Sequence, residues 1–266
     1  KHCLFRPYFT SIAFMPHNIS SSSSNTDDVT KLAAVSSEGI IYMWDISYES
    51  GHCKTSLRKL TPATNDPIHG IAFSTDGQTL VSGGNDAVIH IWNTSERRQL
   101  ALHGHVGPIF SVATTDNTIL SGGYDKYIRV WDIRTAKQRS QIQSHMSMIH
   151  RVACASSSDI VASSYTRDTN VQLWDMRTSK QIANLDSHND SVATIALSPD
   201  GKQLIVAGGD DCGGGGVVYA WDVSTRRLLQ VLKKDSKAVT ATAFSCDGTC
   251  IVTSGDAVRV WGVWFR

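Results

Sequence analysis

A unit of about 40 residues recurs along the chain, and this recurrence constrains the fold more than any other feature of the sequence. The clearest copy runs from Gly104 to Arg134, opening with Gly-His and closing with Trp131-Asp132. Within it, three short β-prone segments are separated by turn residues such as Asp116-Asn117 and Gly122-Gly123. Short runs of this kind, bounded by Gly, Asn and Asp, are typical of strands joined by hairpins. The unit is therefore predicted to be a small antiparallel sheet, which cannot bury both of its faces alone.

Six copies of the unit are found when the chain is aligned on its tryptophans. They end at Trp44, Trp92, Trp131, Trp174, Trp221 and Trp261, so that the successive spacings are 48, 39, 43, 47 and 40 residues. A period of about 40–45 residues, with Gly-His near the start and Trp-Asp near the end, is the signature of WD repeats. The chain therefore resembles the WD-repeat family over nearly its whole length.

The resemblance implies an all-β fold, the β-propeller, in which four-stranded blades surround a central channel. One domain over residues 1–266 is expected, with six recognisable blades that form a ring of six or part of a ring of seven. Each repeat in this family gives the outer strand of one blade and three strands of the next, so residues 1–7 are expected to complete the blade of Trp261. The Ser-rich segment 17–30 is predicted to be a mobile loop within the first repeat, and residues 47–67 an extended connection.

The charge and the cysteines of the chain limit its partners and its location. Lys and Arg number 25 against 24 Asp and Glu, and this balance offers no broad basic surface to nucleic acid or anionic lipid. This balance argues against nucleic acid as a partner, and the local basic pairs such as Arg97-Arg98 are the feature that argues for it. No apolar run is long enough for membrane insertion. The six cysteines are scattered without a CxxC motif, which favours an intracellular protein, cytoplasmic or nuclear. No cofactor or metal is predicted.

The well-preserved repeats contain a His, a Ser and an Asp, which is also the composition of a hydrolase triad. The set recurs in neighbouring repeats together with the Trp, whereas an active site occurs once. The resemblance implies instead a buried hydrogen-bond chain from Trp through Ser and His to Asp. Complete sets are predicted in the third and fourth repeats: His105, Ser121, Asp125 and Trp131, and His145, Ser164, Asp168 and Trp174. The chain is therefore predicted not to be an enzyme, with a hydrolase as the disfavoured alternative.

The resemblance also implies a rigid platform for other proteins, since many WD-repeat propellers bind a partner at one rim of the channel. That rim is formed by the turn before each Trp strand and by the start of each innermost strand. The matching positions predict a partner-binding arc: Tyr8, His69, Phe110, Tyr124, Met148, His150 and Arg167. Exposed aromatic residues and arginine are typical of binding hot spots. The leading prediction is therefore a non-catalytic scaffold that holds a peptide or another protein in a complex.

A narrower alternative comes from two segments that end in Trp-Asp-x-Arg. Residues 119–134, and residues 160–177 with two extra positions, resemble the sixteen-residue box with which WD-repeat substrate receptors dock on the adaptor of a cullin-RING ubiquitin ligase. The docking residues implied are Asp132, Arg134, Asp175 and Arg177. The competing interpretation is that each Asp caps its own turn.

Overall fold

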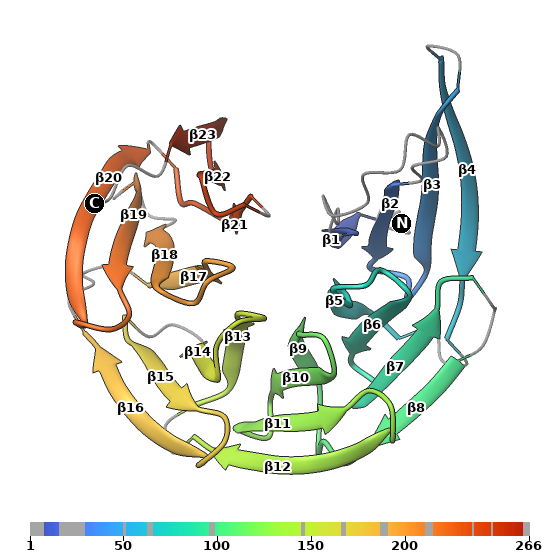
Figure 1. Cartoon of the computed structure of the whole chain (residues 1–266), viewed down its shortest axis with the longest axis horizontal. Helices are drawn as coiled ribbons and strands as arrows, with labels where there is room; N and C mark the ends of the chain where they lie inside the picture. The colour runs from blue at the N-terminus through green and yellow to red at the C-terminus, as the bar shows by residue number, and fades with distance from the viewer. Residues whose placement is uncertain are drawn as a thin grey trace, which may run out of the picture.

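The computed structural model describes residues 8–15, 30–49, 52–62, 66–95, 99–144, 147–165, 169–186, 191–210, 215–235, 237–245 and 247–262. The described residues form antiparallel sheets arranged side by side around a central axis (Figure 1). The predicted completing strand in residues 1–7 lies outside the described residues. So does nearly all of the predicted loop at 17–30, of which only Thr30 is described, as the first residue of a strand.

Six sheets follow one another in chain order, and five of them have four described strands. The first two sheets contain β1 (Phe9–Phe14), β2 (Thr30–Ser36), β3 (Ile41–Glu49), β4 (His52–Leu60), β5 (Ile68–Phe73), β6 (Thr79–Gly84), β7 (Val88–Asn93) and β8 (Gln99–His103). The next two contain β9 (Ile109–Thr114), β10 (Thr118–Gly123), β11 (Tyr127–Asp132), β12 (Lys137–Gln143), β13 (Ile149–Cys154), β14 (Ile160–Tyr165), β15 (Val171–Asp175) and β16 (Lys180–Leu185). The last two contain β17 (Val192–Leu197), β18 (Gln203–Asp210), β19 (Gly215–Asp222), β20 (Arg227–Asp235), β21 (Ala241–Phe244), β22 (Cys250–Ser254) and β23 (Val258–Gly262).

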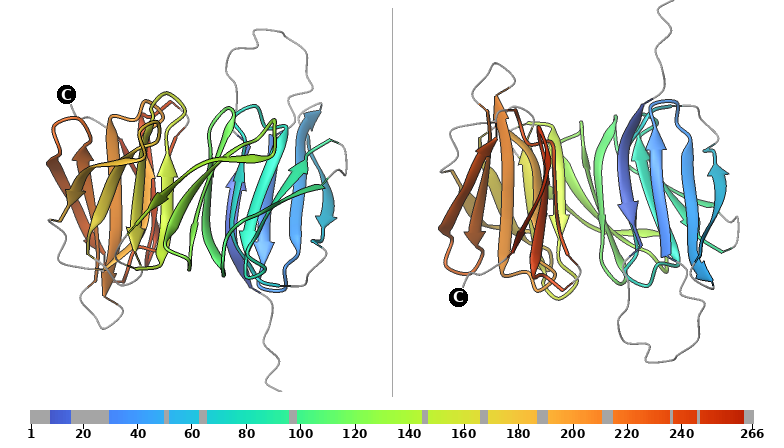
Figure 2. Two further views of the ribbon diagram at one scale, coloured as in Figure 1. Left: turned by 90° about the horizontal axis from the view of Figure 1, so that it is seen from below. Right: turned by 90° about the horizontal axis from the view of Figure 1, so that it is seen from above.

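Each sheet is a propeller blade whose strands are paired in chain order from the axis outwards. The first strand of every blade lies nearest the axis, and in the five blades with four described strands the fourth forms the outer edge (Figure 1). Seen from the side, the strands run between two rims of turns (Figure 2). The predicted all-β propeller with six blades is confirmed. No helix among the described residues is long and apolar enough to cross a membrane.

Asp-Gly turns join the first two strands in the second, fifth and sixth blades. In the second blade the Oγ of Ser74 donates to Asp76 Oδ1 over 2.6 Å, and Gly77 has a φ of +66°. Ser198 and Ser245 make the same bond to the Asp two residues later, before Gly201 and Gly248. A positive φ favours glycine because it has no Cβ, which explains why this dipeptide marks the turn in the sequence.

The core consists of five apolar clusters, one between each pair of neighbouring blades. In five blades the repeated Trp belongs to the cluster shared with the preceding blade: Trp92, Trp131, Trp174, Trp221 and Trp261. The recurring Trp therefore anchors each blade against the one before it. This explains the period in the sequence, because a single sheet gains a buried second face only from its neighbour.

The two end blades carry apolar faces that no described residue covers. Ile12 on β1 is 59 % exposed, whereas Ile71 at the equivalent position of β5 is 7 % exposed. On the last blade Val258 is 72 % exposed, whereas Ile41 at the equivalent position of β3 is fully buried. The ribbon accordingly shows an opening between the first and last blades (Figure 1).

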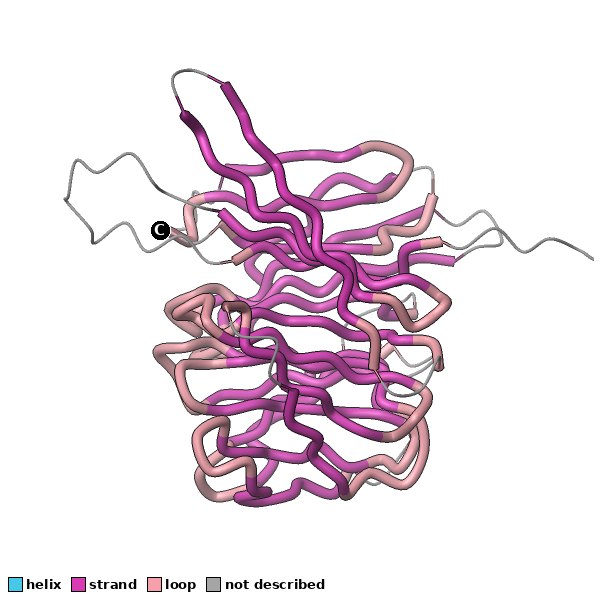
Figure 3. The backbone as a smooth tube through the Cα atoms, turned by 90° about the vertical axis from the view of Figure 1, so that its right-hand side faces the viewer, coloured by secondary structure: helices cyan, strands magenta, loops and turns pink. Residues whose placement is uncertain are grey.

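The prediction of an extended connection over residues 47–67 was wrong. Residues 47–49 continue β3, and β4 pairs with β3 along its whole length as the outer strand of the first blade. Both strands have nine residues, and together they project beyond the other blades (Figure 3). The segment shows no apolar alternation because an outer strand has little to bury.

Candidate functional site

A repeated backbone hydrogen bond builds one rim of the channel. The N–H of Asn85 donates to the carbonyl of Pro67, and the N–H of Tyr124 donates to that of Pro108, each over 2.9 Å. In the first blade Ser37 donates to Tyr8 in the same way, also over 2.9 Å. The turn before each of these Trp strands is thus held against the start of the innermost strand, and the two rim positions predicted from the sequence lie side by side.

Glycines make this close approach possible. A Cβ added to Gly123 would lie 2.2 Å from the carbonyl oxygen of Pro108, and one added to Gly84 would lie 2.3 Å from that of Pro67. Both contacts are with backbone, which cannot rotate away. The Gly-Gly pairs that precede the turns in the sequence therefore have a packing role at the rim.

Most of the predicted partner-binding arc can be placed on this rim. The rings of His69 and Phe110 pack with centroids 5.7 Å apart, and Tyr8 and Tyr124 are 64 % and 56 % exposed. Met148 and His150 are partly buried at the start of β13, and Arg167 lies outside the described residues. Burial, and then the charge of the neighbouring Arg151, lower the pKa of His150 to about 4, so this ring is neutral at neutral pH.

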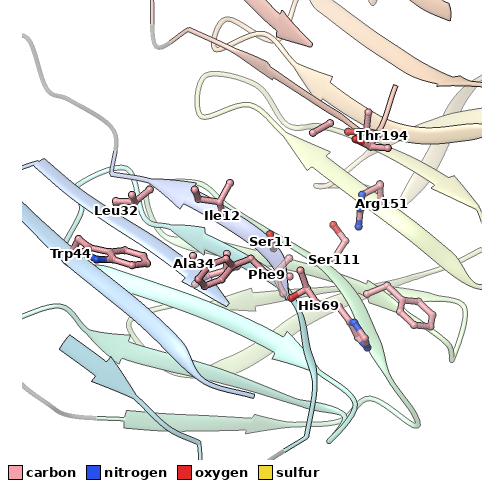
Figure 4. A pocket seen from close by; sticks show the side chains of 17 residues that line it. Phe9, Ser11, Ile12, Leu32, Ala34, Trp44, His69, Ser111, Arg151 and Thr194 are labelled. Carbon is pink, nitrogen blue, oxygen red and sulfur yellow. The ribbon is translucent and has the colours of Figure 1, made fainter. Parts of the chain in front are cut away.

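A cavity of about 640 Å³ opens along the channel beside this rim (Figure 4). Two members of the arc, His69 and Phe110, line it. Phe9, Ile12 and Trp44 form an apolar wall contributed by the first blade. The cavity lies within the size range of pockets that hold small ligands or side chains.

In the third repeat, four side chains form one buried hydrogen-bond chain. Trp131 Nε1 donates to Ser121 Oγ over 2.9 Å, Ser121 Oγ lies 2.7 Å from His105 Nε2, and His105 Nδ1 lies 2.9 Å from Asp125 Oδ2. Because a carboxylate only accepts, the Nδ1–H of His105 donates to Asp125, and the hydroxyl of Ser121 donates to Nε2. Ser121 is fully buried, so its hydroxyl serves the fold rather than an open site.

Asp125, the last residue of this hydrogen-bond chain, accepts hydrogen bonds from several donors. Its Oδ2 also accepts from the backbone N–H of Val106 and from Arg129 Nη2, each over 3.2 Å. Burial of the carboxylate works to raise its pKa, but the hydrogen bond and charge of His105, with the N–H groups of Val106 and Tyr127, outweigh burial. The pKa of Asp125 consequently falls to about 2.

The assignment of Ser164 to the fourth hydrogen-bond set was wrong. Trp174 Nε1 donates to Ser163 Oγ over 2.9 Å, and Ser164 Oγ is buried without a partner among the described residues. Side chains alternate between the two faces of a strand, so a shift of one residue moves the hydroxyl to the other face. Ser121 lies ten residues before Trp131, whereas Ser163 lies eleven residues before Trp174, so counting back from the Trp selects Ser164 instead of Ser163. His145 and Asp168 of this set lie outside the described residues.

These two neighbouring serines give a matched test of the correction. Ser163→Ala is expected to lower the free energy of unfolding by about 1–3 kcal/mol, because the buried Trp174 N–H loses its acceptor. Ser164→Ala removes a hydroxyl without a described partner, and is expected to leave stability unchanged or slightly raised. Urea unfolding followed by Trp fluorescence measures both. A larger loss for Ser164→Ala would restore the original assignment.

Other repeats use substitutes that the Gly-His motif does not reveal. In the second repeat Trp92 donates to Ser82 over 3.1 Å, and the Asp86 carboxylate meets His90 Nε2 at 2.6 Å. His90 comes from the Trp strand itself, two residues before Trp92. In the sixth repeat Trp261 Nε1 donates to Thr253 Oγ1 over 3.0 Å, so a threonine replaces the serine. The strand pairing identifies the residue that accepts the bond from the Trp, because in each blade it lies two positions after the residue paired with that Trp. The residues at this position are Ser82, Ser121, Ser163 and Thr253.

The two Asp-x-Arg pairs occupy tight turns after their Trp strands. Asp132 Oδ1 accepts from the backbone N–H of Arg134 and of Thr135, each over 2.9 Å, and Asp132 Oδ2 accepts from Arg139 Nε over 2.9 Å. These bonds, led by that of Thr135, lower the pKa of Asp132 to about 2.

The second pair has the same geometry. Asp175 Oδ1 accepts from the N–H of Arg177 over 2.8 Å and from that of Thr178 over 3.1 Å. The side chains of Arg134 and Arg177 are exposed. Both aspartates therefore cap their own turns, while the two guanidinium groups face solvent.

No group of three or more His, Cys, Asp or Glu side chains that could hold a metal ion occurs in the part of the chain that the structure describes. The recurring polar sets are the hydrogen-bond chains described above.

Two known families match different parts of the chain. The family described as WD domain, G-beta repeat matches residues 54–93 and 96–132. Each match contains the outer strand of one blade and three strands of the next, β4 with β5 to β7 and β8 with β9 to β11. The repeats are thus offset from the blades, as the resemblance implied. Residues 154–261 match the family described as Eukaryotic translation initiation factor eIF2A, over β14 to β23.

Three curated proteins are similar to parts of the chain. Nuclear distribution protein nudF of Emericella nidulans is 34 % identical over 90 residues, which are 34 % of this chain and 19 % of that protein. Apoptotic protease-activating factor 1 of Rattus norvegicus is 28 % identical over 207 residues, 74 % of this chain and 16 % of that protein. Autophagy-related protein 16 of Arabidopsis thaliana is 28 % identical over 190 residues, 70 % of this chain and 36 % of that protein.

The chain therefore spans between 16 % and 36 % of the length of these relatives. What it shares with the WD domain family is the repeat, and what the structure adds is the ring of blades that these repeats build. The chain is a WD-repeat β-propeller protein.

Proposed function

We propose that this propeller is a non-catalytic scaffold that binds a peptide segment of a partner protein over the channel rim. The observation that carries the proposal is the pair of packed rings of His69 and Phe110 beside the cavity, with exposed Tyr8 and Tyr124 on the same rim. Aromatic side chains give large contact area at low entropic cost and are enriched among binding hot spots. The repeat family and the similarity to nudF, apoptotic protease-activating factor 1 and autophagy-related protein 16 support a protein-interaction scaffold.

A rigid wall supports this role. The rim residues are tied to β5 and β9, whose turns are fixed by the repeated hydrogen bonds from Asn85 and Tyr124. A preorganised surface binds more tightly because less conformational entropy is lost on binding. The hydrolase alternative lacks comparable support, because Ser121 is buried and already accepts from Trp131. A cytosolic or nuclear location stays a prediction.

Affinity capture tests the proposal by comparing wild type with Phe110→Ala/Tyr124→Ala. Proteins that bind the rim are expected to be recovered at least about tenfold less with the double variant, since two hot-spot side chains are removed. Leu229→Ala/Val231→Ala is the matched control, because these side chains are 41 % and 50 % exposed on the outer strand β20. Equal recovery by all three proteins would contradict binding at the rim. Circular dichroism establishes that each variant is folded.

The ligase-adaptor role is a narrower form of the same proposal. Its support is the exposure of Arg134 and Arg177, since an exposed guanidinium can pair with a carboxylate or a carbonyl of an adaptor. Arg177 would exchange its 3.9 Å contact with the exposed Asp159 for such a partner. The use of Asp132 and Asp175 as turn caps weighs against it. In the same capture experiment, a ligase adaptor recovered with wild type and lost with Arg134→Ala/Arg177→Ala would favour this role. An adaptor recovered with neither would exclude it.

A further inference from the structure

One position of the innermost strands is small in five blades and large in one. In the second blade, Ile71 of the innermost strand pairs with Ser82, the residue that accepts the hydrogen bond from Trp92, and the position in question is Gly70, immediately before Ile71. The pairing register identifies the equivalent residue in each of the other blades. Its six occupants are Ser11, Gly70, Ser111, Arg151, Thr194 and Ala241, and all six line the channel cavity. Arg151 is thus a single long, charged side chain in a ring of small residues.

The cavity offers Arg151 no counter-charge. Among the described residues that line it, none has a carboxylate, and Arg151 makes no hydrogen bond or ion pair with any described residue. Nearby hydroxyls are engaged elsewhere: Ser111 Oγ accepts from the N–H of Val152 over 3.1 Å, and Thr194 Oγ1 lies 3.4 Å from that of Thr242. Figure 4 shows Arg151 on the cavity wall between Ser111 and Thr194.

Burial makes this isolation costly. Desolvation lowers the pKa of the Arg151 guanidinium, yet arginine stays charged in proteins. The adjacent His150 is neutral at neutral pH because burial and Arg151 lower its pKa to about 4. A partly desolvated, unpaired guanidinium interacts strongly with any anion that reaches it.

We propose that Arg151 binds a carboxylate of the partner peptide inside the channel, while an adjacent large apolar side chain of that peptide packs on Phe110 and on the apolar wall of the first blade. This inference rests on the proposed peptide-binding function and specifies the chemistry of the ligand. Charge complementarity selects an acidic residue, since the cavity supplies one cation and no described anion. The walls formed by Phe9, Ile12 and Trp44 select an apolar or aromatic neighbour.

A displayed library of random octapeptides tests the inference. Wild type is expected to enrich peptides with Asp or Glu next to a large apolar residue, and Arg151→Gln is expected to lose the acidic preference. Individual wild-type-selected peptides should bind Arg151→Gln at least about tenfold more weakly, because the charged hydrogen bonds are lost. Arg227→Gln removes an equal charge from the exposed outer strand β20 and should bind them like wild type. Arg151→Gln should fold, since it removes no described contact.

The other outcomes are distinguishable. Enrichment of peptides without an acidic preference, weakened by Phe110→Ala, would overturn this inference and leave the proposed function standing. A library that yields no peptide dependent on Phe110 or Tyr124 would overturn both. Inorganic phosphate is tested alone by thermal unfolding. If phosphate stabilises wild type but not Arg151→Gln, and the acidic peptides bind both proteins equally, the site takes a small anion and the peptide assignment is wrong.

Discussion

Asp125→Ala is expected to lower the free energy of unfolding by about 3–5 kcal/mol, the usual cost of removing one partner from a buried charged network. The side chain of Asp125 is 6 % exposed, and its carboxylate accepts from both His105 and Arg129. Without it, two buried donors lose their acceptor: His105 in the connection after β8, and Arg129 on β11. Urea unfolding measures the loss. Asp159→Ala is the control, because Asp159 is 51 % exposed and lies 3.9 Å from Arg177, so its loss should cost below about 0.5 kcal/mol.

The same carboxylate predicts a pH dependence. Its pKa falls from 3.8 in the unfolded chain to about 2 in the folded protein, which corresponds to roughly 2 kcal/mol of stabilisation. A depressed pKa contributes stability that is present above pH 3.8 and is lost as the pH falls toward 2. Asp125→Asn should therefore show a flatter decline of stability than wild type across this window. Identical acid limbs for the two proteins would contradict the buried ion network.

Ile71→Ala is expected to cost about 2–5 kcal/mol, whereas Ile12→Ala at the equivalent position should cost less than about 1 kcal/mol. Ile71 is 7 % exposed and packs with Ala33 and Met43 of the preceding blade. Ile12 is 59 % exposed, so truncating it removes little buried area. Thermal or urea unfolding of the two variants measures the difference. Equal losses would mean that the face of the first blade is as fully covered as the interfaces between blades.

The architecture could be predicted because it is encoded locally and repeatedly. Five of the six repeated Trp side chains fill the space between two blades, so the spacing of these residues along the chain reports the blade spacing directly. The Asp-Gly turns, such as that at Gly77, need a positive φ and therefore carry their own signature. The rim positions followed from the same repeat, since the turn before the Trp strand is bonded to the start of the innermost strand.

What could not be predicted depends on register and on contacts between distant segments. Ser163 rather than Ser164 accepts from Trp174, and the choice depends on the length of the turn between the two strands. Because both candidates are serines, the residue type does not distinguish them. The histidine that bonds to Asp86 is His90, which lies on the Trp strand β7 and not in a Gly-His motif, so the motif could not identify it. The outer strand β4 buries too little to show an alternating pattern. Arg151 became distinctive only when the register set it beside five small residues.

The Trp of the first blade, Trp44, has surroundings that differ from those of the Trp residues in the other blades. Trp44 has Ala34 where the other blades have a hydroxyl acceptor or Val206, and it stacks on Tyr42 at a centroid distance of 6.1 Å. Trp44 has no preceding blade among the described residues, and it lines the cavity instead. Trp44 thus contributes to the apolar wall of the proposed binding site.

The central claim is that a partner binds the channel rim, and hydrogen exchange of the chain with a captured partner tests it most directly. We expect slower exchange in the complex at the turns of Asn85 and Tyr124 and at the starts of β9 and β13. The outer strands β8, β12 and β16 should exchange as in the free protein. Protection confined to those outer strands, with the rim unchanged, would show that the partner binds elsewhere and would contradict the account.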